Sequence, residues 1–300
     1  MQNRPSFCYV NGAYLRMEEA GVHVEDRGNL FSDAVYEGIA LNNGNLLDVT
    51  PHLNRLQRSL DILQMDLPMS VRSIELIIYE LARRNRMKNG FVYLQVSRGV
   101  ARRNHAFPNP KVEPSLFIVI YPDRTPSSQE YNQGISVITR PDIRWGRRDA
   151  KTVSLLANVL AKEDGVAQGC KETWLVDDKT NLITEGSASN AFIVTDSGAI
   201  KTHPASQDIL GGITREVVLN LARDNGIEVI EQPFSIDEMR QASEAFGTST
   251  TMQVIGVTVI DNMPVGKVTL SEEKKIGPVT QKLIQLYAQH VAEQTQKSDI

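Results

Sequence analysis

Lys151 has an amine that can form a Schiff base with an aldehyde. It stands in the segment RRDAKTVSLL, after two arginines and an aspartate and just before a predicted helix. Positive neighbours such as Arg147 and Arg148, or burial, lower the pKa of a lysine and increase the fraction of neutral amine. Judged from this segment alone, an ordinary surface lysine is the better interpretation.

Glu185 lies in ITEGSASN, between a predicted strand that ends near Thr184 and another that begins near Asn190. A carboxylate at a strand end, among small residues, can reach into a cleft. There it could pair with the protonated ring nitrogen of a pyridine cofactor. Taken alone, the segment also fits a turn glutamate, which is the commoner case.

Three segments could bind a phosphate. The segment GGIT (residues 211–214) precedes a predicted helix, whose N-terminus exposes N–H groups and favours an anion. The segment TSTT (residues 248–251) offers hydroxyls, and Arg55 in HLNRLQRS has a forked guanidinium. The alternatives are a glycine turn with Thr214 as a cap, a polar turn and a solvated arginine.

Arg103 and His105, in SRGVARRNHAFPNP, could hold a carboxylate. In an extended segment residues two apart share a face, which separates this pair from Arg102. Tyr36, in FSDAVYEG at the start of a predicted strand, could orient a substrate. A basic surface loop and a core tyrosine are the plainer interpretations.

Strands and helices alternate around these residues in a way that predicts an α+β (mixed α/β) fold. Asn11-Gly12 between apolar runs predicts a hairpin of 7–10 with 13–15. A leucine stripe from Leu53 to Leu63 predicts a helix capped by Thr50. The other expected elements are strands at 36–41, 46–49, 91–97, 115–121, 172–176, 190–194 and 228–230 and on both sides of Gly256, and helices at 71–87, 154–167, from 213, and around 276–286.

The polar segment Pro122 to Gln133 contains two prolines and is interpreted as an interdomain linker. We therefore expect a smaller N-terminal α+β domain over 1–122, a linker over 123–133 and a larger C-terminal domain over 134–300 that binds a cofactor.

Composition excludes several classes of function. Lys and Arg number 32 and Asp and Glu 36, a net charge of −4, and no basic block indicates a nucleic-acid or membrane-surface partner. Two cysteines make no disulfide framework and no zinc site, so no metal is expected and a cytoplasmic location fits best. No long apolar run or signal segment is present, and the motifs G-x-G-x-x-G, G-x-x-x-x-G-K and G-x-S-x-G are absent.

The order of these segments along the chain is more informative than any one of them. From about residue 7 to about residue 286 the sequence resembles the fold-type IV pyridoxal-phosphate (PLP) enzymes, most closely their D-amino acid aminotransferase branch. The likeness rests on seven segments in family order: EDRGNLFSDAVYE, HLNRLQRS, QVSRGVARRNHAFP, DIRWGRRDAKTVSLLANVLAK, ITEGSASNAF, THPASQDILGGITRE and FGTSTT.

The resemblance implies a two-domain enzyme with pyridoxal 5'-phosphate at the domain interface. Lys151 matches the Schiff-base lysine, which also shuttles a proton, and Glu185 matches the carboxylate at the pyridine nitrogen. Leu210 matches the apolar residue against the ring, and Arg144 is a candidate to support Glu185. The positions that match phosphate ligands are Arg55, Ile213, Thr214, Ser249 and Thr250.

The resemblance also implies transamination between D-amino acids, such as D-alanine and D-glutamate, and 2-oxo acids, such as 2-oxoglutarate and pyruvate. Tyr36, Arg103 and His105 match the trio that binds the substrate α-carboxylate. In that branch the arginine and histidine come from the neighbouring subunit, which implies a homodimer. Two departures, Arg102 beside Arg103 and Ala188 in place of a serine, put fine substrate preference in doubt.

Several alternatives remain open. A branched-chain L-amino acid or (R)-amine transaminase and an aminodeoxychorismate lyase share the fold, although RGVARRNHAFP does not favour them. A non-catalytic binding protein of the same fold is an alternative from another class.

Overall fold

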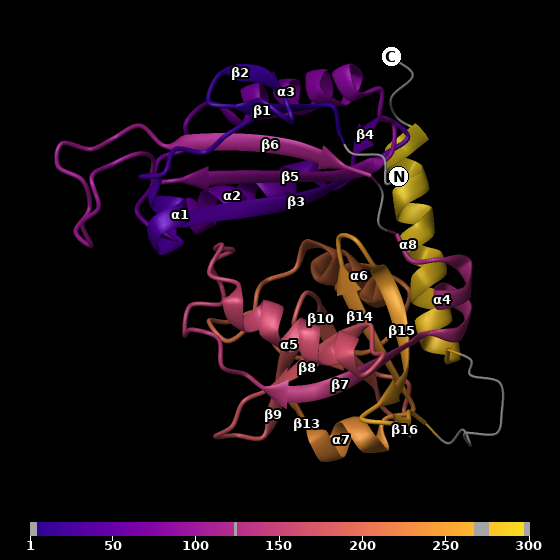
Figure 1. The fold of residues 1–300 in the computed structure, drawn as a ribbon. Helices are drawn as coiled ribbons and strands as arrows, with labels where there is room; N and C mark the ends of the chain where they lie inside the picture. Colours follow the sequence, from indigo (N-terminus) through magenta and orange to yellow (C-terminus); the bar gives the residue numbers. More distant parts are fainter. Residues whose placement is uncertain (1–4, 123–124, 267–275, 297–300) are drawn as a thin grey trace. The chain divides into compact units, whose positions relative to one another are not determined.

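The computed structural model describes residues 5–122, 125–266 and 276–296, which form two compact units (Figure 1). Of these residues the first unit takes 5–122, 150–154 and 294–296, and the second takes 125–149, 155–266 and 276–293. Neither unit is one continuous stretch. The segment with Lys151 clusters with the first unit because Thr152 bridges Val35 and the Tyr36 amide donates to the Lys151 carbonyl at 3.0 Å.

Within the described residues, the first unit is built on a six-stranded antiparallel sheet in the order β2-β1-β6-β5-β3-β4. The expected hairpin of β1 and β2 is confirmed, and its turn residues Asn11 and Gly12 have positive φ values of 44° and 98°. The strands are β1 (Phe7–Val10), β2 (Ala13–Arg16), β3 (Ala34–Asn42), β4 (Asn45–Leu46), β5 (Gly90–Ser97) and β6 (Ser115–Tyr121).

Helices α2 (Val49–Ile62) and α3 (Val71–Asn85) share a core with this sheet, and a short helix α1 (Arg27–Phe31) precedes β3. Three leucines of the predicted stripe, Leu53, Leu56 and Leu60, are buried in that core, and Leu63, the C-cap of α2, packs against it partly buried. Alternate residues of β5, such as Val92 and Leu94, enter the same core, so the residues between them face the other side of the sheet.

The start of α2 differs from the prediction that Thr50 caps it. The N-cap is Asp48, whose carbonyl accepts the His52 amide at 3.2 Å, and the helix begins at Val49. Thr50 and Pro51 lie in the first turn, where a proline is tolerated because the first amides of a helix have no partner within it.

The second unit's described part contains a mixed sheet in the order β12-β11-β10-β14-β15-β7-β8-β9-β13, with β16 paired to β15. One core lies between the sheet and helices α6 and α8, around Phe192 and Phe246, and another surrounds Trp174. The expected α+β class is confirmed. The strands are β7 (Ile135–Pro141), β8 (Glu172–Val176), β9 (Leu182–Gly186), β10 (Asn190–Val194), β11 (Ile200–Thr202), β12 (Val229–Glu231), β13 (Phe234–Ser235), β14 (Glu244–Ser249), β15 (Gln253–Ile260) and β16 (Met263–Pro264). The helices are α4 (Ser128–Gln133), α5 (Leu156–Ala167), α6 (Ile213–Asp224), α7 (Ile236–Gln241) and α8 (Pro278–Gln296).

Two details of this unit differ from what the sequence predicts. The segment interpreted as a linker contains α4, which starts with a capping box between Ser127 and Glu130. Gly256 lies inside β15 rather than between two strands. A Cβ at this glycine would stand 2.3 Å from Cγ2 of Ile276, so the position has no room for a side chain.

Candidate active site

The amine of Lys151 lies beside Tyr36 on the half-buried face of the first sheet. Its Nζ is 3.3 Å from the Tyr36 hydroxyl and 4.3 Å from the centre of the ring, which itself stacks on Tyr93. The Lys151 amide donates to Ser59 Oγ at 3.1 Å, which fixes the backbone. Among the described residues no carboxylate forms an ion pair with Lys151.

Arg147 and Arg148 are not unpaired cations. Arg147 Nε donates to Asp149 at 3.0 Å, and Arg148 forms ion pairs with Asp142 and Asp208 at 3.6 and 3.7 Å. Both arginines that precede Lys151 in the sequence therefore have carboxylate partners of their own.

Glu185 is a buried carboxylate at the end of β9 and is only 4% exposed. Its oxygens accept from Arg144 Nη1 at 2.5 Å, Asn190 Nδ2 at 2.9 Å and the Leu210 amide at 3.1 Å. Burial raises the pKa of Glu185, and Arg144 and the Leu210 amide oppose that rise. The result is a rigid carboxylate with increased proton affinity.

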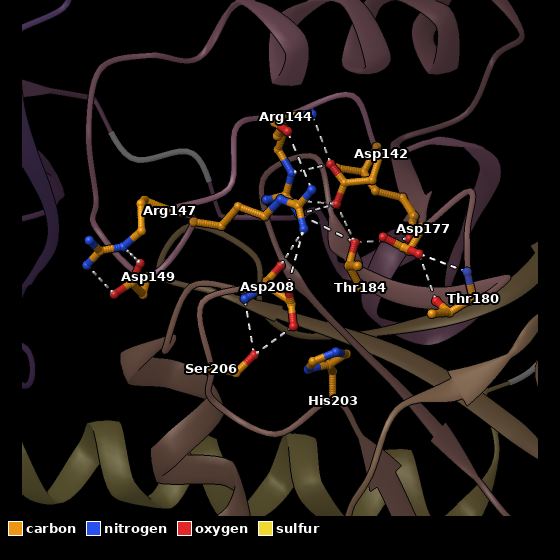
Figure 2. A network of polar contacts seen from close by, with 12 residues as sticks. Asp142, Arg144, Arg147, Asp149, Asp177, Thr180, Thr184, His203, Ser206 and Asp208 are labelled. Carbon is orange, nitrogen blue, oxygen red and sulfur yellow. Dashed lines mark hydrogen bonds and ion pairs between the residues drawn. The ribbon is translucent and has the colours of Figure 1, made fainter.

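Arg144 is itself fixed by Asp142, as Figure 2 shows. Its Nε and Nη2 donate to the two oxygens of Asp142 at 2.9 and 2.7 Å, and Thr184 donates to the same carboxylate at 2.7 Å. Burial disfavours ionisation of Asp142, but the hydrogen bonds and charge of Arg144 outweigh it and lower the pKa of Asp142. The chain Asp142–Arg144–Glu185 thus supports Glu185, as was expected of Arg144.

Asn190, the first residue of β10, joins Glu185 to the loop before α6. Its amide nitrogen donates to both Glu185 Oε2 and the Leu210 carbonyl, at 2.9 and 3.0 Å. A Cβ on Gly212 would lie 2.0 Å from Asn190 Oδ1, so only glycine fits where the loop passes this side chain. Sequence reasoning used Asn190 only to mark the start of a strand, although a polar residue opening the apolar run NAFIV was a usable signal.

The start of α6 fits a phosphate. Gly212 is its N-cap and has no side chain to cap the helix, so the N-cap residue itself leaves the first amides of α6 without a side-chain acceptor. Opposite Asn190 on β14 lies Thr248, whose buried hydroxyl lacks a hydrogen-bond partner among the described residues. An uncapped helix start and a buried unsatisfied hydroxyl are the features that a phosphate would complete.

Ser249 and Thr250 follow Thr248 at the end of β14, but part of their polar surface is already used. The hydroxyl of Ser249 accepts the Met252 amide at 3.1 Å and so closes the turn after the strand. The alternative interpretation of this segment as a polar turn is therefore also true of the structure. Both residues are half-buried.

Arg55 is buried on α2 rather than solvated. Its Nε and Nη2 donate to the two oxygens of Glu37 on β3 at 2.7 and 2.8 Å, and His52 Nδ1 lies 2.9 Å from the same carboxylate. Burial opposes ionisation of Glu37, yet Arg55 and His52 outweigh it and lower the pKa of Glu37. Glu37 therefore fixes the plane of the guanidinium.

Arg103 and His105 lie on an exposed loop between β5 and β6, and both contact one aromatic ring. Arg103 Cζ is 5.3 Å from the centre of the Phe31 ring, and the His105 ring centre is 5.2 Å from it. The structure thus brings the predicted pair together, although the loop is not a strand. Among the described residues no hydrogen bond joins Tyr36 to either of them; the Tyr36 hydroxyl accepts from Lys151 Nζ instead.

A cavity of about 240 Å³ lies in the first unit between the end of α2 and the loop 107–114, and none of the predicted site residues lines it. Across the ranges that the structure describes, no group of three or more His, Cys, Asp or Glu side chains could hold a metal ion. No described helix is long and apolar enough to cross a membrane.

Comparison with known proteins identifies the family. The model of the class IV amino-transferases matches residues 34–260. The chain belongs to this family. A D-alanine aminotransferase from Staphylococcus haemolyticus is 38% identical over 275 residues, or 92% of this chain and 94% of the relative. A D-alanine aminotransferase from Listeria monocytogenes serotype 4b is 36% identical over 285 residues, 95% of this chain and 96% of the relative.

Solved structures agree with the class IV amino-transferase assignment. The branched-chain amino acid aminotransferase of Escherichia coli superposes with a TM-score of 0.85 at 25% identity, covering 94% of this chain and 93% of that one. The branched-chain amino acid aminotransferase of Thermoproteus uzoniensis, solved with norvaline, superposes with a TM-score of 0.79 at 26% identity. The superposition covers 98% of this chain and 96% of that one. A further branched-chain amino acid aminotransferase, complexed with N-(5'-phosphopyridoxyl)-L-glutamate, superposes with a TM-score of 0.83 at 26% identity. The superposition covers 99% of this chain and 96% of that one. The expected family and fold are thereby confirmed.

Proposed function

We propose that this class IV amino-transferase uses pyridoxal 5'-phosphate to exchange amino groups between D-amino acids, D-alanine among them, and 2-oxo acids. The relatives named D-alanine aminotransferase are 35–38% identical over at least 92% of the chain. The observation that carries the proposal is Glu185, a buried carboxylate fixed by Arg144, Asn190 and the Leu210 amide. Such a group suits the nitrogen of a pyridine ring.

The residues present fit the cofactor. Lys151 would hold its aldehyde carbon, Glu185 its ring nitrogen, and Leu210 would pack on the ring. The phosphate would be bound by Arg55, Ile213, Thr214, Ser249 and Thr250. When bound, the cofactor supplies an electron sink that accepts the charge left when a substrate Cα loses its proton.

Lys151 is proposed as the general base that removes the proton from the substrate Cα. In the reverse half-reaction it would return a proton to the Cα of the product amino acid. The Tyr36 hydroxyl, 3.3 Å from Nζ, would orient the amine as it gains and loses the proton. Glu185 would keep the ring nitrogen protonated, because its carboxylate is held in place by Arg144, Asn190 and the Leu210 amide.

Tyr36, Arg103 and His105 are proposed to bind the substrate α-carboxylate. An arginine holds a carboxylate through two parallel hydrogen bonds, so the position of Arg103 would decide which face of the substrate turns toward Lys151. We further propose that the protein works as a homodimer, with Arg103 and His105 serving the neighbouring subunit's site.

A second candidate is a branched-chain L-amino acid aminotransferase, which the similar solved structures favour. Their identity of 25–26% is lower than the 38% of the D-alanine aminotransferases, and so the D-amino acid proposal is preferred.

The test is the amount of pyruvate released from alanine when the PLP-loaded protein receives 2-oxoglutarate. D-alanine should yield pyruvate and L-alanine should not, and Arg103→Ala should lower kcat/KM for D-alanine about a hundredfold by removing a bidentate charge pair. Turnover of L-leucine without turnover of D-alanine would establish the second candidate instead.

A further inference from the structure

Helix α1 holds the backbone of the loop that carries Arg103 and His105. The Arg27 side chain, 4% exposed, reaches this loop from a position more than seventy residues earlier. Its Nη1 donates to the carbonyls of Asn104 and Ala106 at 2.6 and 3.3 Å, and its Nη2 donates to the His105 carbonyl at 3.4 Å. One guanidinium therefore binds three successive carbonyls of an otherwise exposed segment.

The orientation of Arg27 is fixed by Asp33. Arg27 Nε donates to Asp33 Oδ2 at 2.8 Å, and Arg98 donates to both oxygens of the same carboxylate at 2.7 and 2.9 Å. Two buried guanidinium groups thus share one carboxylate. Two positive charges meet one negative charge, and backbone carbonyls stabilise the excess. Arg27 donates to the carbonyls of the loop, and Arg98 donates to the carbonyls of Leu63 and Gln64.

Phe31, in the last turn of α1, holds the side chains of the same loop. Its ring contacts three groups: Arg27 Cζ at 4.8 Å, Arg103 Cζ at 5.3 Å and the His105 ring at 5.2 Å. A guanidinium over an aromatic face is attracted by the ring's negative π-face, and this attraction restricts its direction without consuming its N–H donors. The contact with Phe31 therefore leaves the N–H donors of Arg103 able to bind a carboxylate.

We propose that Arg27 and Phe31 are positioning residues that hold Arg103 and His105 in the orientation that binds the substrate carboxylate, and so determine affinity and enantiomer preference. The inference rests on the proposed function, because it takes Arg103 and His105 as the carboxylate-binding pair. Neither Arg27 nor Phe31 touches substrate in this account; each acts through the loop.

The experiment compares Arg27→Lys and Phe31→Leu with wild type in the full-length, PLP-loaded protein. Lysine keeps the charge of Arg27 but not the fork that spans three carbonyls, and leucine keeps the apolar bulk of Phe31 but not the π-face. Phe31→Tyr is the conservative rescue. Arg83→Lys on α3, where Arg83 pairs with Glu80 on the helix surface, is the matched control.

Two measurements are made on each protein: KM and kcat for D-alanine and L-alanine, and the rate of tryptic cleavage after Arg102 and Arg103. For Arg27→Lys and Phe31→Leu we expect KM for D-alanine to rise about tenfold with kcat within about twofold, the pattern of lost ground-state binding. The D-to-L preference should fall with it. Cleavage should accelerate about tenfold, because protease attack follows the population of the open loop.

Unchanged KM and unchanged cleavage in a folded variant would overturn the proposal, as would a loss of kcat with KM unaltered. If Arg27→Lys yields no folded protein, Phe31→Leu decides alone. Absence of D-alanine turnover by wild type would refute the proposed function, and the substrate part of this inference with it. The cleavage rates would then still show whether α1 holds the loop.

Discussion

At the scale of single residues, Glu185 shows how a buried charge is retained. Isolated in an apolar interior a carboxylate would take up a proton, but here three donors converge on it. One of them, Arg144, is bound to Asp142 on its other side. The donors thus hold the carboxylate in one position and oppose the rise in pKa that burial causes.

Glu185→Gln should therefore lower kcat for D-alanine by at least about a hundredfold, because an uncharged amide cannot keep a ring nitrogen protonated. Binding of PLP, followed by its visible absorption, should persist, since the other cofactor ligands remain. Glu18→Gln, at an exposed ion pair with Arg16, is the control and should retain activity. A Glu185→Gln protein with kcat within about threefold of wild type would remove Glu185 from the reaction.

Lys151→Ala should abolish transamination and leave no covalently attached cofactor after hydride reduction. The effect on kcat should exceed the roughly 10²–10⁴-fold that is typical of general bases, since the same amine also anchors the cofactor. Mass spectrometry of the peptide that contains position 151 provides the measurement. Modification at the same yield in Lys151→Ala would show that another lysine, such as the half-exposed Lys162, is the attachment site.

At the scale of elements, β3 and α2 are joined by a buried charged group. Glu37 on β3 receives two hydrogen bonds from Arg55 and faces His52, and all three side chains are at most 3% exposed. The pair costs desolvation energy that its attraction offsets only because the geometry is bidentate. We interpret this ion pair as the interaction that orients the Arg55 guanidinium.

Glu37→Gln should destabilise the protein by about 3–5 kcal/mol in denaturant unfolding, because it leaves the Arg55 charge buried without its partner. Glu75→Gln, at a surface pair with Arg72 on α3, should change stability by less than about 1 kcal/mol. Equal effects of the two substitutions would contradict the assigned role of the buried pair.

The same group predicts a pH dependence. The folded protein lowers the pKa of Glu37 below its unfolded value, so its stabilisation is complete above the unfolded pKa and is lost as the pH falls through the folded pKa. The unfolding free energy of wild type should therefore fall more steeply on acidification than that of Glu37→Gln. Parallel pH profiles would show that Glu37 does not carry this ion pair.

Much of the element structure could be predicted because it follows local rules. The Asn11-Gly12 turn, the leucine stripe of α2 and strands β6, β8 and β10 depend on neighbours in sequence. Helix α4 also had a local signal in Ser127 and Glu130, which the surrounding prolines and polar residues obscured. The strand through Gly256 could not be predicted, because it is Ile276 that requires the glycine there.

Some residues of the candidate site could be predicted from the sequence, but the residues that support them could not, because their contacts are distant in sequence. Lys151 and Glu185 lie in segments that resemble a family, but their chemistry was not evident from spacing alone. The supporting residues depend on contacts distant in sequence: Arg27 meets the His105 carbonyl 78 residues on, and Glu37 meets Arg55 18 residues on. No pattern in one sequence reports which carbonyl or carboxylate a buried arginine will find.

At the scale of the whole molecule, the proposed homodimer predicts complementation between inactive chains. If Arg103 serves the neighbouring subunit, mixing Lys151→Ala with Arg103→Ala chains creates dimers in which one site is complete. Random exchange makes about half of the dimers mixed, each with one of two sites intact, so activity should recover to about a quarter of wild type. Light scattering gives the dimer mass, and a mixture that stays inactive despite exchange would place Arg103 in its own subunit's site.

The most direct test of the central claim is the visible absorption of the PLP-loaded protein as D-alanine is added, with L-alanine and L-leucine in parallel samples. We expect D-alanine to remove the absorption band of the lysine-bound cofactor within one half-reaction, and neither L-amino acid to do so at the same concentration. A band that is unaffected by D-alanine but removed by L-leucine would contradict the D-amino acid assignment, and with it the role given to Arg103 and His105.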